Sequence, residues 1–169
     1  MSKVAPFHVI LLDASHDRSS FDSDSAALNR YLQQQATQDI RRRVTACFVA
    51  VTSDDAPRIA GYYTLASSSV PLHDLPAATG KKLPRYPSVP VVRMGRLAVA
   101  KTFKGAGLGA ALLADALGRA AHAEIAAYAL VVDAKDDAAA SFYRHHGFIA
   151  MPSAPRTLFL PLAAVKELA

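Results

Sequence analysis

One segment constrains the fold of this chain more than any other, because a strand-like run, three alternating glycines and a helix-like run follow one another directly. The run Val91 to Ala100 is apolar and rich in valine, and glycines follow at positions 105, 107 and 109. From Gly107 to His122 apolar residues recur at helical spacing, as Leu112, Leu113, Ala116, Leu117 and Ala120. Glycines let backbone amides approach one anion, and a helix that begins there adds the positive end of its dipole. The segment therefore predicts a strand, an anion-binding turn and a helix.

The glycine spacing leaves one alternative open and excludes two others. Close packing of a helix against a strand accounts for such glycines equally well. A dinucleotide-binding turn needs the spacing G-x-G-x-x-G, and a P-loop needs G-x-x-x-x-G-K-[ST]. The segment Gly105 to Gly109 has neither spacing. An anion site of another type is thus favoured, without being required.

The first half of the chain predicts a strand, a helix and a hairpin. Val9 to Leu12 is the first predicted strand, and Asp22 or Ser23 is the predicted helix cap. Residues 43–52 and 58–66 are β-rich and flank a turn, which predicts an antiparallel pair. The expected inward face of the helix consists of Leu28, Tyr31, Leu32 and Ala36.

The second half predicts a loop followed by alternating strands and helices. Residues 70–90 hold five of the ten prolines, so we expect a loop there with a short helix at 76–81. Residues 128–133 predict a buried strand and residues 157–160 a closing strand. Between them we expect a helix capped by Asp136 and ended by Gly147. The order predicts an α/β (α+β) domain around one mixed sheet.

Composition narrows the class of protein. With 169 residues, 51% hydrophobic and 20% charged, the chain predicts one globular domain over residues 1–169. Neither a secretory signal nor an apolar run long enough for a bilayer is evident, so we expect a cytoplasmic protein without membrane contact. The single cysteine, Cys47, lies in an apolar run, which favours a buried thiol and excludes a cysteine zinc site; we expect no metal. The net charge of +5 suits a polyanion or an anionic cofactor, or simply a solvated basic surface.

The glycine segment resembles the coenzyme loop of the GNAT acetyltransferase superfamily, which reads Gln/Arg-x-x-Gly-x-Gly/Ala. Here lysine replaces the usual first residue, in Lys104-Gly105-Ala106-Gly107-Leu108-Gly109. The resemblance implies that acetyl-CoA is the acetyl donor and that the preceding strand splays from its neighbour. It also implies that the backbone of Leu97, Ala98 and Val99 pairs with the pantetheine arm, and that the loop through Ala110 holds the pyrophosphate.

A second match lies near the C-terminus, where Phe142-Tyr143 and Gly147-Phe148 are similar to the family's Phe-Tyr-x-x-x-Gly-Phe. Without the upstream loop, Tyr143 would be read as a core residue. With the loop, the resemblance puts its hydroxyl near the coenzyme sulfur, where it would assist the departing thiolate. An ordinary tyrosine titrates near 10 and a thiol near 8.5, so complete proton transfer is uphill by roughly 2 kcal/mol. We therefore expect a hydrogen bond that strengthens as charge develops.

Several flanking segments resemble, more narrowly, the GNAT toxins of bacterial toxin–antitoxin pairs. They are Phe21-Asp22 with Leu28 and Leu32, Ile59 to Ala66, Leu83 to Pro87 with Pro90, and Gly95 to Val99. This resemblance implies acetylation of the α-amino group of aminoacyl-tRNA and inhibition of translation. The chemistry agrees, because an α-amine is far less protonated at neutral pH than a lysine. We read Asp133, Asp136 and Asp137 as loop and cap residues, so no carboxylate base is evident.

Basic residues offer a possible track for the tRNA backbone. The candidates are Arg41, Arg42, Arg43, Arg85, Arg93 and Arg96, with Lys81 and Lys82 nearby. Solvated residues at helix ends and sheet edges remain the alternative. Arg93 and Arg96 have opposite strand parity, so in a regular strand they face opposite sides.

The family resemblance also implies partners and leaves other functions open. It implies a homodimer and a ribbon-helix-helix antitoxin, with DNA contacted only through that antitoxin. Two alternatives remain: a GNAT enzyme that acetylates a small amine or a protein N-terminus, and a catalytically silent module that binds coenzyme or acts as a corepressor.

Overall fold

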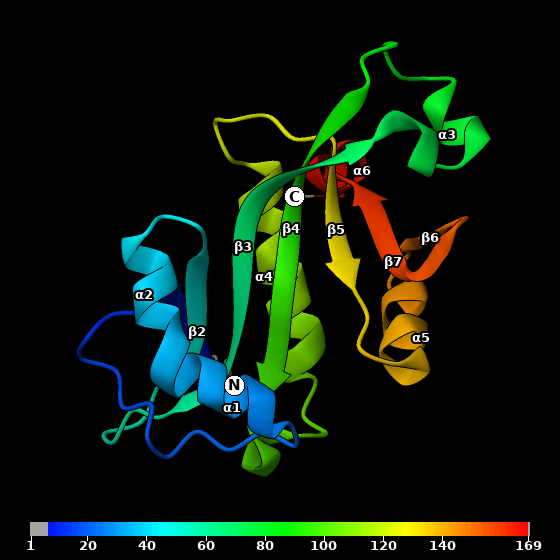
Figure 1. Ribbon diagram of the computed structural model, residues 1–169. Helices are drawn as coiled ribbons and strands as arrows, with labels where there is room; N and C mark the ends of the chain where they lie inside the picture. Colours follow the sequence, from blue (N-terminus) through cyan, green and yellow to red (C-terminus); the bar gives the residue numbers. More distant parts are fainter. Residues whose placement is uncertain (1–6, 169) are drawn as a thin grey trace. The chain divides into compact units, whose positions relative to one another are not determined.

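The computed structural model describes residues 7–168, with side chains described as far as Val165 (Figure 1). Its hydrogen-bonded strands follow the order β1-β2-β3-β4-β5-β7-β6, a mixed sheet of seven strands within the described residues. The strands are β1 Phe7–Leu11, β2 Ala46–Thr52, β3 Ile59–Pro71, β4 Ser88–Val99, β5 Ala129–Asp133, β6 Ile149–Met151 and β7 Ala154–Pro161. The predicted mixed α/β sheet is confirmed.

The chain divides into two compact units. The first unit comprises the residues up to Leu65 together with Arg96–Ala116, and the second comprises Ala66–Gly95 and the residues from Leu117 onward. Strands β3 and β4 therefore contribute residues to both units.

In the first unit, three consecutive helical segments precede an antiparallel pair. Helix α1, Ala26–Arg30, leads into a π-helical turn at Tyr31–Gln35 and then into α2, Ala36–Arg41, which lies against β2. The cap is Ser25, whose Oγ accepts from the Leu28 amide at 3.2 Å, so the predicted cap at Asp22 or Ser23 was wrong. Ser23 is instead buried and hydrogen-bonded to Asn29. The predicted inward face is confirmed: Tyr31, Leu32 and Ala36 are buried and Leu28 packs against them.

In the second unit, β5 is the central strand. It pairs in parallel with β4 over Val91–Met94 and antiparallel with β7. Helix α5, Asp137–His145, lies against β7 (Figure 1), begins at the predicted cap Asp136 and is followed by Gly147 at a φ of 93°. Asp136 accepts from the Ala139 amide at 2.8 Å. The core cluster of this unit includes Val70, Leu75, Val89, Val91, Ala129, Val131, Met151 and Phe159.

The proline-rich loop is shorter than predicted. Strand β3 continues to Pro71 and β4 begins at Ser88, so the connection spans residues 72–87. It contains a 3-10 turn at Leu72–Asp74 and the short helix α3, Ala77–Gly80, close to the predicted position. Pro71 ends its strand, a position that proline tolerates well. Strand β6 and helix α6, Leu162–Leu168, were not predicted.

Candidate functional site

The glycine-rich turn of the first unit has the geometry of an anion cradle. Gly105 and Gly107 adopt φ values of +80° and +81°, a region that favours glycine, and open space surrounds the position of a Cβ on each. Helix α4, Leu108–Ala121, begins directly after them. Its first intrahelical bond runs from the Ala111 amide to the Gly107 carbonyl at 3.1 Å, so the amides of Leu108, Gly109 and Ala110 have no helical acceptor. These amides are available to an anion.

Acidic residues before α1 hold the two lysines of this turn. Lys104 forms an ion pair with Asp24, and the Lys101 ammonium lies 3.5 Å from the Asp22 carboxylate. The Lys101 amide also donates to the Asp22 carbonyl at 2.8 Å. The predicted charge of Lys104 is therefore present beside the cradle, exposed, but already paired.

Strand β4 is free of β5 where the resemblance predicts contact with pantetheine. The pairing of the two strands covers Val91–Met94 and ends there. Leu97, Ala98 and Val99 lie beyond that register, with Ala98 buried and the other two half-buried.

In the second unit, Tyr143 differs from the other buried tyrosines. The hydroxyls of Tyr31, Tyr62 and Tyr63 donate to Asp39, the Leu28 carbonyl and Asp115. Tyr143 is 7% exposed on α5, yet within the described residues its hydroxyl has no hydrogen-bond partner. Burial, assisted by the negative charge of Asp133, raises the pKa of Tyr143 to about 12. Among the described residues the hydroxyl is thus a protonated donor that remains available to a ligand or to solvent.

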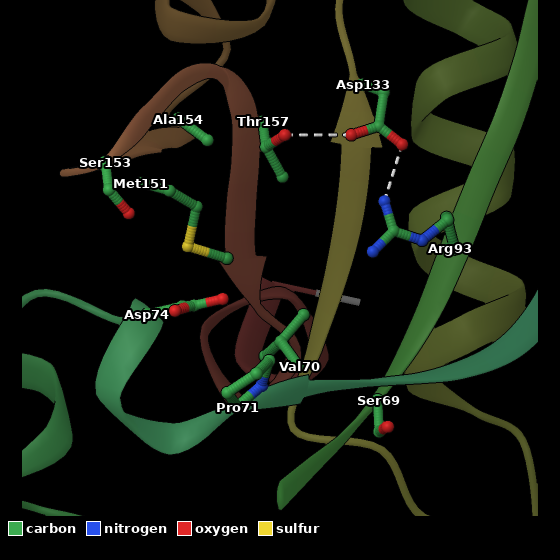
Figure 2. A pocket seen from close by; sticks show the side chains of 10 residues that line it. All are labelled: Ser69, Val70, Pro71, Asp74, Arg93, Asp133, Met151, Ser153, Ala154 and Thr157. Atoms are coloured by element: carbon green, nitrogen blue, oxygen red, sulfur yellow. Dashed lines mark hydrogen bonds and ion pairs between the residues drawn. The ribbon is translucent and has the colours of Figure 1, made fainter.

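A cavity in the second unit lies beside a network that sequence reasoning missed (Figure 2). Its volume is about 240 Å³. Arg93 and Asp133 form an ion pair at 2.5 Å, and the Thr157 hydroxyl donates to the other Asp133 oxygen at 2.9 Å. The pair spans 40 residues of sequence, and only the parallel register of β4 and β5 brings its members together. Asp136 is a cap as predicted, whereas Asp137 pairs with Arg156.

The candidate tRNA-binding arginines have different surroundings. Arg41, Arg42 and Arg43 are exposed at the end of α2, and Arg43 has a φ of 60°. Arg85 is exposed in the 72–87 connection. The Arg96 guanidinium carbon lies 3.5 Å from the centroid of the Tyr31 ring, whereas Arg93 is paired with Asp133. Arg93 and Arg96, which have opposite strand parity, therefore contact different partners.

The family of this chain follows from its sequence and fold. Residues 18–157 match the family model of the acetyltransferase (GNAT) domain, and the chain belongs to that family. It is therefore an acetyltransferase, and the similar protein AtaT has been solved with acetyl-CoA.

Within that family the similar proteins are toxins. The chain is 37% identical to the tRNA-acetylating toxin of Mycobacterium tuberculosis (strain ATCC 25618 / H37Rv) over 154 residues, which cover 90% of both chains. AtaT complexed with acetyl-methionyl-tRNAfMet is 29% identical, with a TM-score of 0.89 over 96% of this chain and 98% of AtaT. A tyrosine-to-phenylalanine mutant of KacT is 29% identical, with a TM-score of 0.87 over 98% of this chain and 100% of KacT. AtaT has also been solved with the C-terminus of the antitoxin AtaR and acetyl-CoA, and as an AtaT–AtaR complex bound to DNA.

Among the described residues, no helix has both the length and the apolar character needed to span a membrane.

Proposed function

We propose that this chain transfers the acetyl group of acetyl-CoA to the α-amino group of aminoacyl-tRNA and so blocks translation as a toxin. The observation that carries the proposal is the 37% identity to a tRNA-acetylating toxin over 90% of both chains. The complex of AtaT with acetyl-methionyl-tRNAfMet supports an acetylated aminoacyl-tRNA as the product. The whole chain, residues 1–169, acts as one catalytic domain in the cytoplasm, where charged tRNA is found.

The coenzyme is held by backbone groups in this proposal. The amides of Gly105 to Ala110 bind its pyrophosphate, since those at the start of α4 lack helical acceptors. Leu97, Ala98 and Val99 pair with the pantetheine arm through their own backbone groups. Lys104 contributes charge rather than geometry, because an ammonium lacks the planar fork of arginine and here already has Asp24 as a partner.

Tyr143 donates a hydrogen bond to the sulfur as the thioester breaks. Its pKa of about 12 exceeds that of a thiol by several units, so complete transfer of its proton is uphill by about 5 kcal/mol. A protonated donor aimed at a developing thiolate stabilises the transition state without giving up the proton. The unpaired hydroxyl supports this role, because no internal acceptor competes for it within the described residues.

The tRNA backbone is bound by exposed arginines. Arg41, Arg42 and Arg43 offer three adjacent charges, and Arg85 adds another from a loop. Arg96 is half-buried, and its guanidinium carbon lies 3.5 Å from the Tyr31 ring centroid, a contact that restricts the orientation of its N–H groups before the ligand arrives. Arg93 contributes less to phosphate binding than the others, because Asp133 balances its charge.

The partners follow from the relatives. An antitoxin binds the chain as AtaR binds AtaT, and DNA is contacted through that complex. We propose that this antitoxin is a ribbon-helix-helix protein and that the toxin alone is a homodimer.

Acetyl transfer to a charged tRNA pool tests the function. Purified protein is incubated with radiolabelled acetyl-CoA and either charged or deacylated total tRNA. Label on charged tRNA alone, released by mild base together with the amino acid, is the expected result. Label on small amines or protein N-termini but not on tRNA would assign a different acceptor. Coenzyme binding without any transfer would show a silent module.

A further inference from the structure

The cavity of the second unit has a charge opposite to that of the protein. Asp74 and Asp133 reach it from different sides, and among the described residues that line it Arg93 is the only cationic one (Figure 2). Among the described lining residues, two carboxylates therefore face one guanidinium. The chain as a whole carries +5. A local excess of negative charge on a basic protein favours a cationic group and disfavours a phosphate.

Asp133 is fixed in place and still has capacity to accept hydrogen bonds. Arg93 binds one of its oxygens and Thr157 the other, which sets the plane of the carboxylate. An ionised carboxylate offers about four acceptor positions, so roughly two remain. The side chain is 51% exposed, which leaves those positions open to a ligand. Its negative charge also acts on the Tyr143 hydroxyl.

The size and walls of the cavity restrict what can enter. Its volume of about 240 Å³ lies below the range of roughly 300–1,000 Å³ that is usual for drug-sized ligands, so it suits one amino-acid residue and not a nucleotide. Val70, Pro71 and Met151 supply apolar surface. The uncharged side chain of an amino-acid residue can pack against that surface while the α-amine of the same residue contacts a carboxylate.

We propose that this cavity binds the aminoacyl group of the acceptor, with Asp133 accepting a hydrogen bond from the α-amine and an uncharged side chain lying against Val70, Pro71 and Met151. The inference rests on the proposed function, because it assigns the amine-bearing end of that substrate. It gives Arg93 the task of orienting Asp133. The carboxylate binds the amine and does not need to deprotonate an ammonium, since an α-amine is partly neutral at physiological pH. As the C–N bond forms and the C–S bond breaks, the nitrogen releases one proton to water and the thiolate takes one proton from water.

Two matched carboxylate variants test the role of Asp133. In Asp133→Asn the KM for charged tRNA should rise about ten- to a hundredfold, the loss expected for a hydrogen bond to a charged group, with coenzyme affinity unchanged. Asp137→Asn, which removes another exposed carboxylate paired with an arginine, should leave that KM unchanged. Equal effects of the two variants, or a loss of coenzyme affinity in Asp133→Asn, would overturn the assignment.

A minimal ligand tests the cavity without tRNA. L-valine methyl ester should bind the full-length protein, whereas its N-acetyl derivative, which lacks the charge, should bind at least tenfold more weakly. Nuclear magnetic resonance should place the ester by shifts of the Met151 and Thr157 methyl signals. Ser153→Tyr, at an exposed lining position, should abolish those shifts, and Ala123→Tyr, at an exposed loop position, should not.

These readouts separate the two proposals. Ester binding at the cavity with no acetylation of any charged tRNA would overturn the tRNA function and retain the amine site. Acetylation of charged tRNA with a KM unaffected by both Asp133→Asn and Ser153→Tyr would retain the function and overturn the site.

Discussion

At the scale of single residues, the hydroxyl of Tyr143 is the group on which catalysis should depend most. Replacing Tyr143 with phenylalanine removes one donor and keeps the buried ring. We expect turnover to fall roughly 100- to 1,000-fold, as for the loss of one donor to a developing anion, with little change in coenzyme affinity. Steady-state acetylation and calorimetric titration of coenzyme measure the two effects. Tyr128→Phe is the control, since it removes the hydroxyl of a half-buried tyrosine elsewhere in the second unit. Turnover equal to wild type in Tyr143→Phe would rule out the catalytic role of the Tyr143 hydroxyl.

Arg43 combines an unfavourable backbone with a proposed RNA contact. Its φ of 60° lies in the left-handed region, which costs a non-glycine residue about 1 kcal/mol. Arg43→Gly should therefore raise the free energy of unfolding by up to about 1 kcal/mol while weakening tRNA binding. Arg43→Lys, which retains both the charge and the strained backbone, should change neither property strongly. Urea denaturation measures the free energy of unfolding, and filter binding measures the affinity for tRNA. An Arg43→Gly variant less stable than wild type would contradict the proposed backbone strain at Arg43.

At the scale of elements, the packing of β3 against β4 and α4 depends on the absence of a side chain at Gly61. A Cβ there would lie 2.8 Å from the Ala98 carbonyl oxygen and 2.9 Å from a Leu112 methyl. The oxygen belongs to the backbone and cannot move cheaply, so Gly61→Ala should lower the free energy of unfolding by about 1–3 kcal/mol. Gly118→Ala is the matched control in α4, where open space surrounds the site, and should raise it by roughly 0.5–1 kcal/mol. Urea denaturation of both variants checks the opposite signs.

Elements with a long, regular pattern were predictable, and short or irregular ones were not. Helix α4 and strand β5 have clear apolar periodicities and lie within a residue or so of their predicted bounds. The π-helical turn at Tyr31–Gln35 has no recognised sequence signal, and β6 has only three residues. Pro71 and Pro90 were read as loop residues although both lie in strands, because proline is excluded from a paired interior and not from a strand end or edge.

At the scale of the whole molecule, the excess of basic residues predicts a salt-dependent affinity for tRNA. The logarithm of the association constant should fall linearly with the logarithm of salt concentration, with a slope of about −0.7 for each phosphate neutralised on a single strand. Removing Arg42 or removing Arg85 should each reduce the magnitude of that slope by the amount that corresponds to about one phosphate contact. Filter binding at several salt concentrations measures it. An affinity for tRNA that does not change with salt concentration would exclude an electrostatic track of basic residues.

The candidate site was predictable where its residues are close in sequence. The proposed coenzyme loop and Tyr143 each lie in a short motif, so the family resemblance proposes both of them without a structure. The network of Arg93, Asp133 and Thr157 joins three strands, and no local sequence pattern predicts it. Asp133 looked like a loop residue because it ends β5, and its partners depend on the registers of β4 and β7.

The ion pair between Lys104 and Asp24 gives the glycine-rich turn an internal counter-ion. If this turn binds the pyrophosphate as proposed, Lys104 would exchange an internal carboxylate for an external phosphate, and fewer dissolved anions would be released than an unpaired lysine would release. Coenzyme affinity should therefore respond to salt less steeply than the number of lysines beside the loop implies. The same exchange sets Asp24 free just before α1, so the segment that leads into that helix carries one more uncompensated negative charge whenever the coenzyme is bound.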